Sequence, residues 1–395
     1  MTLYQRRKAV RAKWCPMPEI QYIFSQHGAE YLSRHNLPPH VCKAVRAIQN
    51  CRTATLGGHI DACDECGHIK ISYNSCRNRH CPKCQALSKE RWVMARNDDL
   101  LPVPYFHVVF TLPEELCIPA FQNQSKVYDL LLKCSHETLR ELAADKKYLG
   151  AEIGCISILH TWGQNLNYHP HVHMIVPGGG LTSDGKWHDS RKKFFIPVKV
   201  MASKFRGKFL YHFKQMKLDW YGGSQELNDP SKWQDFLNIL YQKDWYVYCK
   251  CPFKASNSVI SYLGRYTHRV AIANHRILSV KDTVVSFKWR DYRDGKKEKV
   301  MTLSVDEFIR RFLLHILPPR FTKIRHYGFL SSAAKKKKLT LCKLLTGAKI
   351  TTKAPEKLSY VELMQVLTGR DITLCPRCGK GHFVSISGLS PPIAV

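Results

Sequence analysis

Three histidines alternate along one short segment, with a spacing typical of a metal site. His169, His171 and His173 are separated by single residues within the stretch 167–177. Alternate side chains of an extended strand point to the same face, so the three imidazoles would project together. Imidazole nitrogen is a common ligand for divalent metals. The pattern predicts a metal-binding strand, and a structural cluster of histidines on a sheet is the alternative.

Two tyrosines lie four residues apart in the stretch 256–269, which we expect to be helical. Tyr262 and Tyr266 would then leave the helix on one face, with Arg265 and Arg269 on an adjacent face. Such a pair, taken alone, is usually a packing feature. Beside a metal-binding strand in a basic protein, the tyrosines become candidate nucleophiles and the arginines candidate DNA contacts.

The charge of the chain indicates a polyanionic partner. Its 395 residues contain 61 Lys and Arg against 31 Asp and Glu, a formal net charge of +30. Nucleic acid is the commonest polyanion that such an excess binds, and membrane lipid is the lesser alternative. Four consecutive lysines, Lys335, Lys336, Lys337 and Lys338, predict a contact with the DNA backbone, with a solvated tail as the alternative.

A metal, a pair of phenols and a nucleic-acid partner together point to phosphodiester transfer. A divalent ion would polarise a phosphate oxygen, and a tyrosine oxygen would attack phosphorus and stay covalently attached. Because the phosphotyrosine bond stores the energy of the broken bond, a free 3′-hydroxyl could reverse the step without ATP. No small-molecule cofactor is expected.

The cysteines predict structural zinc. Cys63 and Cys66 are fourteen residues from Cys81 and Cys84, and two Cys-x-x-Cys turns can give one ion four thiolates. Further ligands for a second zinc could come from Cys51, His59, Cys76 and His80, which could equally be free thiols and surface imidazoles. Cys375 and Cys378, with His382, resemble part of another site whose missing partner could be Cys342, Cys249 or Cys251.

The elements that must position these residues follow from apolar patterning. Helices are expected near residues 20–24, 41–48, 125–144 and 201–220, and strands near 102–113, 152–161 and 280–292. We predict an α+β chain with a basic helical arm and zinc-binding module at 1–99, a nuclease domain at 100–277 with an insertion at about 181–250, and a basic region at 278–395. The chain has neither a run of eighteen apolar residues nor a secretion-type N-terminus, so a cytoplasmic location without membrane contact is expected.

The motifs together resemble the IS91 family of transposases, which belong to the HUH class with paired tyrosines. The resemblance is carried by His169-Pro-His171-Val-His173, by the segment from Tyr262 to Asn274, and by the cysteine module that ends at Cys81-Pro-Lys-Cys84-Gln85. It implies rolling-circle-like transposition of single-stranded DNA through a 5′-phosphotyrosine. The expected partners are single-stranded or hairpin ends of a mobile element and a target site, in a bacterial nucleoid.

The resemblance also implies roles for single residues. His171 and His173 would be the HUH pair, on a central strand of an antiparallel sheet flanked by helices, and Tyr262 and Tyr266 would be the nucleophiles. Gln164 is the candidate third ligand for Mg²⁺ or Mn²⁺, in competition with His169. Two other functions stay open: a replication initiator or relaxase with the same chemistry, and a zinc-ribbon DNA-binding protein without catalysis.

Overall fold

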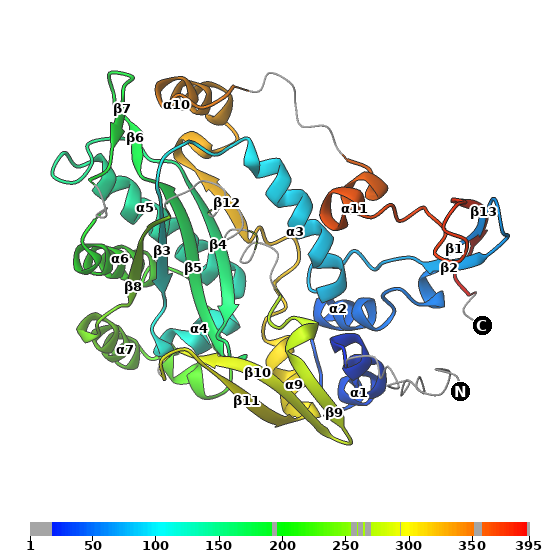
Figure 1. Cartoon of the computed structure of the whole chain (residues 1–395). Helices are drawn as coiled ribbons and strands as arrows, with labels where there is room; N and C mark the ends of the chain where they lie inside the picture. Colours follow the sequence, from blue (N-terminus) through cyan, green and yellow to red (C-terminus); the bar gives the residue numbers. More distant parts are fainter. Residues whose placement is uncertain are drawn as a thin grey trace, which may run out of the picture.

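Five strands form the main sheet (Figure 1). In spatial order they are β12 (Ile324–Tyr327), β4 (Cys155–Trp162), β5 (Tyr168–Pro177), β3 (Tyr105–Thr111) and β8 (Val247–Phe253), and every pairing is antiparallel. All eight residues of β4 are buried, because both faces of the sheet are covered. The computed structural model describes residues 18–191, 196–253, 259, 264, 270–292, 294–350 and 358–392.

Helices cover one face of this sheet. They are α4 (Cys117–Gln122), α5 (Gln124–Ala144), α6 (Val198–Phe213) and α7 (Pro230–Gln242). Strand residues of one parity, such as Val172 and Met174, share a buried cluster with Leu131 of α5 and Phe205 of α6. Burying these side chains removes apolar surface from water and makes this layer the largest core. The predicted helix at 125–144 is confirmed, while the helix expected at 201–220 ends at Phe213.

A second core joins the N-terminal helices to a segment near residue 300. Helices α1 (Ile20–Arg34) and α2 (Pro39–Gln49) pack against α9 (Val305–Leu313) and the three-stranded sheet of β9 (Ile277–Lys281), β10 (Val284–Asp291) and β11 (Lys297–Ser304). The rings of Phe24 and Phe312 meet edge to face at 5.3 Å. Arg34 forms a bidentate ion pair with Asp306, with N–O distances of 2.9 and 3.0 Å.

A small sheet brings the two ends of the chain together. Its strands are β13 (Phe383–Leu389), β1 (Gly58–Cys63) and β2 (Ile69–Tyr73), in that order. From this region α3 (Pro82–Asn97) runs towards the main sheet (Figure 1). Two short strands, β6 (Gly179–Leu181) and β7 (Trp187–Asp189), form a separate hairpin. The remaining helices are α10 (Thr340–Leu345) and α11 (Tyr360–Thr368). Short helical turns are η1 (Ala54–Leu56), η2 (Glu114–Leu116), η3 (Gly222–Asn228), η4 (Asn274–Arg276), η5 (Gly328–Leu330) and η6 (Lys335–Leu339).

The chain is a mixed α+β protein, and its segments cross the predicted domain boundaries. The stretch 181–250 supplies α6 to the main core and most of β8 to the sheet. Of the region after 277, β12 joins the main sheet and β13 joins the N-terminal sheet. Among the described helices, none combines the length and apolar character needed to cross a bilayer.

Candidate active site

Three histidines meet on neighbouring strands at the centre of the main sheet. His171 and His173 lie on β5, the central strand, and His160 lies on β4 directly opposite His171. Their nearest ring nitrogens all fall within 4.8 Å of one another. Strand alternation puts them on the face opposite α5 and α6, with Ile158 and Ile175.

Hydrogen bonds orient the first two rings. The carbonyl of His169 can only accept, so Nδ1 of His171 carries the proton of their 2.7 Å bond and Nε2 is the nitrogen that could ligate a metal. Nε2 of His171 lies 3.1 Å from Nε2 of His173. Two adjacent ligands of a six-coordinate ion with bonds of about 2.1 Å are separated by roughly 3 Å. The pair therefore fits one divalent ion.

A fourth histidine supports the pair from β3. Nε2 of His107 lies 2.8 Å from Nδ1 of His173. Burial, followed by the nearby charge of Lys250, lowers the pKa of His107 to about 4. A neutral His107 can accept the Nδ1 proton of His173 and leave Nε2 of His173 for the metal, as outer partners of metal-bound histidines commonly do.

Sequence reasoning missed His160 and His107 as site residues. Each is a lone histidine in an otherwise apolar strand, and both are nearly inaccessible, at 2% and 4% exposure. A buried polar side chain in such a strand needs a partner. The need for a polar partner was therefore a signal in the sequence that His160 and His107 belong to a site. The order of the strands was required to identify that partner.

The two predicted third ligands, Gln164 and His169, are not among these three imidazoles. Gln164 lies in the loop between β4 and β5. Its backbone carbonyl accepts a 2.5 Å hydrogen bond from the Arg276 guanidinium. His169 contributes its carbonyl to His171, and its own ring is outside the group of close nitrogens. The structure thus offers His160 as a third imidazole in place of His169, and the Gln164 side chain as a ligand stays a prediction.

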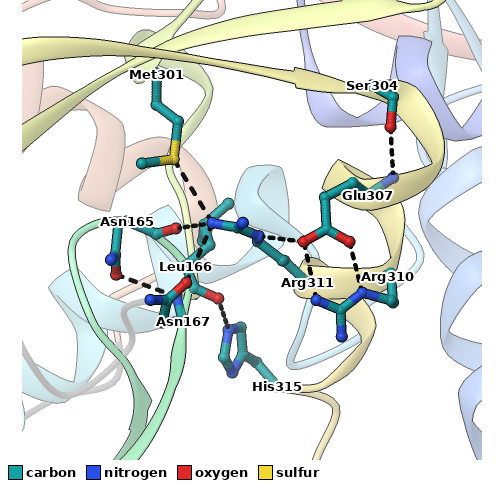
Figure 2. Close-up of polar contacts among 9 residues, drawn as sticks. All are labelled: Asn165, Leu166, Asn167, Met301, Ser304, Glu307, Arg310, Arg311 and His315. Carbon is teal, nitrogen blue, oxygen red and sulfur yellow. Dashed lines mark hydrogen bonds and ion pairs between the residues drawn. The ribbon is translucent and has the colours of Figure 1, made fainter.

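The loop that joins the two histidine strands is held by α9 (Figure 2). Arg311 donates to the carbonyl of Asn165 and to the side chain of Asn167, both at 3.1 Å. His315 donates through Nε2 to the carbonyl of Leu166 at 3.1 Å and contacts Thr161 through Nδ1 at 3.2 Å. These bonds fix the loop although Leu166 has an unusual positive φ of 64°.

Charge on α9 keeps Arg311 in position. Glu307 accepts from Nε of Arg310 and from Nε of Arg311, each at 2.6 Å (Figure 2). The bond from Arg310 is the main reason why the pKa of Glu307 is lowered to about 2. Ser304 caps the helix by accepting from the backbone N–H of Glu307.

The predicted nucleophiles Tyr262 and Tyr266, and the predicted DNA contacts Arg265 and Arg269, lie outside the described residues. Two neighbours of Tyr262 are described. Val259 is fully buried in the cluster that contains Ile158 and Ile175, on the histidine side of the sheet. Gly264 approaches α3 so closely that a Cβ there would meet Val93 at 2.8 Å.

A basic groove adjoins this region. Its volume is ≈ 870 Å³, and its lining includes Gly264 and Gln164. Its other lining residues include aromatic and basic side chains from η4 and β10, among them His275, Arg276, Lys288, Trp289, Arg290 and Tyr292. Aromatic rings between cations are typical of a path for single-stranded nucleic acid.

The cysteines form two groups of four, and they divide differently from the sequence prediction. Cys51, Cys76, Cys81 and Cys84 form one group, with Sγ of Cys84 at 3.7 Å from that of Cys51 and 3.6 Å from that of Cys76. Thiolates at about 2.3 Å from a tetrahedral zinc are about 3.8 Å apart, so the group fits that ion. The neighbouring Cys76 thiol lowers the pKa of Cys84 to about 2, which favours a thiolate there.

The second group corrects the expected pairing. Cys63 and Cys66 meet Cys375 and Cys378, and neither Cys81 nor Cys84 belongs to this group. The pairing was missed because β13 returns to β1 from more than 300 residues away, which no local spacing reveals. The proposed partner Cys342 is instead buried in an apolar cluster.

The candidate zinc histidines also lie outside both groups. His59 is beside Asp61 at 3.5 Å, and His382 contacts Thr373 at 3.0 Å. Nε2 of His80 accepts from the backbone of Leu317, and burial lowers the pKa of His80 to about 3. Four sulfurs complete each tetrahedron without an imidazole.

The lysine run lies at the other end of β4 from His160. Lys335 pairs with Asp99 and Lys338 pairs with Glu152, each at 2.6 Å, while Lys336 and Lys337 are exposed. Two of the four charges are therefore partly neutralised within the chain. Their contact with DNA remains a prediction.

Comparison with known proteins agrees with these features. Residues 154–338 match the family model described as putative transposase, and residues 23–112 match the transposase zinc-binding domain. A putative transposase, y4qJ, of Sinorhizobium fredii (strain NBRC 101917 / NGR234) is 46% identical over 379 residues, which cover 93% of this chain and 95% of that protein. The transposase for insertion sequence element IS801 of Pseudomonas savastanoi pv. phaseolicola is 26% identical over 382 residues, covering 93% and 90%. No solved structure gives a significant match. This chain belongs to the IS91 family of transposases.

Proposed function

We propose that this transposase cuts and rejoins single-stranded DNA by a metal-assisted reaction at the histidine cluster, with Tyr262 and Tyr266 as nucleophiles. The observation that carries the proposal is the convergence of His160, His171 and His173 within 4.8 Å. The burial of Val259 on the same side of the sheet supports it, because Tyr262 follows three residues later.

The chemistry that a divalent ion supplies at such a site is neutralisation of charge on the phosphate being cleaved. His160, His171 and His173 would hold that ion. Imidazole is a better ligand for transition metals than for Mg²⁺, which prefers oxygen. Of the two expected ions, we therefore propose Mn²⁺ as the one that binds more tightly.

The proposed step exchanges one phosphodiester bond for another. The tyrosine oxygen forms a bond to phosphorus as the bond from phosphorus to the 3′ oxygen breaks. The tyrosine proton ends on that oxygen, which leaves a free 3′-hydroxyl and a 5′-phosphotyrosine. Attack by a 3′-hydroxyl reverses the exchange and joins strands without an external energy source.

The groove that contains Gln164 and Gly264 is the proposed path of the DNA strand. Trp289 and Tyr292 would stack on bases, while Arg290 and His275 would lie near phosphates. Binding through such contacts should weaken steeply with salt, because each neutralised phosphate releases counterions. We place the reaction on the ends of a mobile element and on its target.

A covalent-adduct assay tests the proposal. Parent protein, Tyr262→Phe, Tyr266→Phe and the double variant are incubated with labelled single-stranded element-end DNA and Mn²⁺ or Mg²⁺, then run on a denaturing gel. We expect a metal-dependent adduct that the double variant does not form. Tyr241→Phe is the matched control, because Tyr241 is exposed on α7 and does not line the groove, and it should form the adduct normally.

Two results would reject the proposal. An adduct that persists in the double variant would exclude these nucleophiles. Salt-sensitive DNA binding without any adduct, under either metal, would indicate a zinc-bearing DNA-binding protein instead.

A further inference from the structure

The second cysteine group has the geometry of a complete zinc site. Sγ of Cys63 lies 3.7 Å from that of Cys378, and Sγ of Cys66 lies 3.7 Å from that of Cys375. These separations match the edge of about 3.8 Å expected between thiolates on a tetrahedral zinc. All four sulfurs are within 4.8 Å of one another.

The two halves of this group are built alike. In each, a Cys-x-x-Cys turn is followed by a glycine, Gly67 or Gly379, with φ of 67°. The glycine N–H donates to the carbonyl of the first cysteine, at 3.0 Å for Gly67 and 2.9 Å for Gly379. The left-handed conformation favours glycine at both places. Two equivalent turns therefore face each other, each presenting two sulfurs.

Backbone pairing continues outward from the sulfurs. Strand β13 runs antiparallel to β1, from Cys63 opposite Phe383 to Gly58 opposite Leu389. Between the turns, Asp64 accepts from the N–H of His382 at 2.7 Å, and its own N–H donates back to the His382 carbonyl at 3.1 Å. The C-terminal segment is thus aligned on the N-terminal hairpin.

Apolar burial contributes little to this attachment. Among residues 358–392, only Leu363, Cys375 and Gly381 are buried. A segment that removes so little apolar surface from water gains too little to offset the entropy of ordering it. Zinc bound to thiolates can supply that free energy, as it does in small zinc domains.

We propose that Cys63, Cys66, Cys375 and Cys378 form a second structural zinc site, which fastens the C-terminal segment to the N-terminal zinc-binding domain. Two of its ligands lie outside the 23–112 match to that domain. The N-terminal domain therefore depends on the far end of the chain, and loss of the last residues would leave Cys63 and Cys66 with half a site.

Metal counting by native mass spectrometry tests the proposal. The full chain carries His160→Ala and His171→Ala in every sample, so that imidazole-bound zinc does not enter the count. We expect two zinc ions in this background and one after Cys375→Ser with Cys378→Ser. Cys42→Ser with Cys117→Ser is the matched control, because neither thiol belongs to a group, and should keep two. One ion in the background protein, or two after the C-terminal changes, would overturn the proposal.

Cleavage of the chain tests the attachment of the C-terminal segment separately from the number of zinc ions. A protease site is inserted after Gly347, an exposed turn residue, and the purified zinc-loaded protein is cut there. We expect the C-terminal fragment to co-elute with the rest of the chain, and to separate after treatment with a zinc chelator or in the Cys375→Ser, Cys378→Ser variant. A fragment that separates while zinc is bound, or stays attached after zinc is removed, would contradict the role.

Discussion

The histidine cluster and the cysteine groups are built on different parts of the fold. The histidines lie on paired strands of a sheet whose two faces are each covered by an apolar cluster. The cysteines stand on turns and helix ends around a small sheet, and β13 and β2 of that sheet are mostly exposed. The histidines are held by the main core, and Cys51 and Cys81 are buried in the core of α1, α2 and α9, whereas the second cysteine group has little core to hold it.

The histidine and cysteine sites also differ in the number and kind of their metal ligands. Three neutral imidazoles leave positions around an ion open for water or a phosphate oxygen, as catalytic sites require. Four thiolates close a tetrahedron and leave no position for a substrate. Metal at the histidines should therefore matter for the reaction, and metal at the cysteines for folding.

The largest expected effect is a difference in unfolding free energy between a cysteine variant and a histidine variant. Cys84→Ser removes one thiolate of the first cysteine group, so we expect loss of one zinc and of several kcal/mol of unfolding free energy. His171→Ala should leave zinc content at the cysteines and the unfolding midpoint nearly unchanged. Urea unfolding with metal analysis measures both. An equal loss of stability in the two variants would contradict the distinction between a structural cysteine region and a catalytic histidine region.

The next effect concerns the third ligand. His160→Ala should slow DNA cleavage about a thousandfold, which corresponds to roughly 4 kcal/mol of transition-state stabilisation. His169→Ala is the control, because the His169 ring lies outside the group of ring nitrogens, and Gln164→Ala tests the ligand expected from the family resemblance. Single-turnover cleavage at saturating Mn²⁺ compares the three. A larger loss in Gln164→Ala than in His160→Ala would restore the sequence-based assignment.

A smaller effect concerns the support of His173. His107→Ala removes the acceptor of the 2.8 Å contact to Nδ1, so we expect metal affinity to fall about 10- to 100-fold. His107→Gln, whose side-chain oxygen can accept the same proton, should recover part of the affinity. Calorimetric titration with Mn²⁺ gives the values. Equal affinity in the parent and His107→Ala would show that His173 needs no such support.

The smallest effect is a pH dependence beneath the loop of the histidine strands. Burial lowers the pKa of His315 to about 4, below its usual value of about 6.5. The unfolded chain therefore binds more protons between these values, and stability falls as the pH drops from about 6.5 towards 4. The contribution is about 2 kcal/mol between pH 7 and pH 5. His315→Gln should flatten the urea-unfolding free energy by that amount over this range, and an unchanged slope would assign the acid sensitivity elsewhere.

Local patterns in the sequence determined much of this protein. The alternation of His169, His171 and His173 predicted a strand, because strand geometry depends on nearest neighbours, and β5 confirms it. The helices near residues 20, 41 and 125 were likewise readable from their apolar spacing. The family followed from motifs that are short and contiguous.

Only the tertiary structure decided which distant residues share a site. His160 and His107 join His173 because β4 and β3 pair on either side of β5, and strand order is not written in any single segment. Cys375 and Cys378 meet Cys63 and Cys66 because β13 returns to β1. Periodicity fixes the direction of a side chain within its own element, whereas long-range pairing follows from the burial and hydrogen bonding of the whole chain.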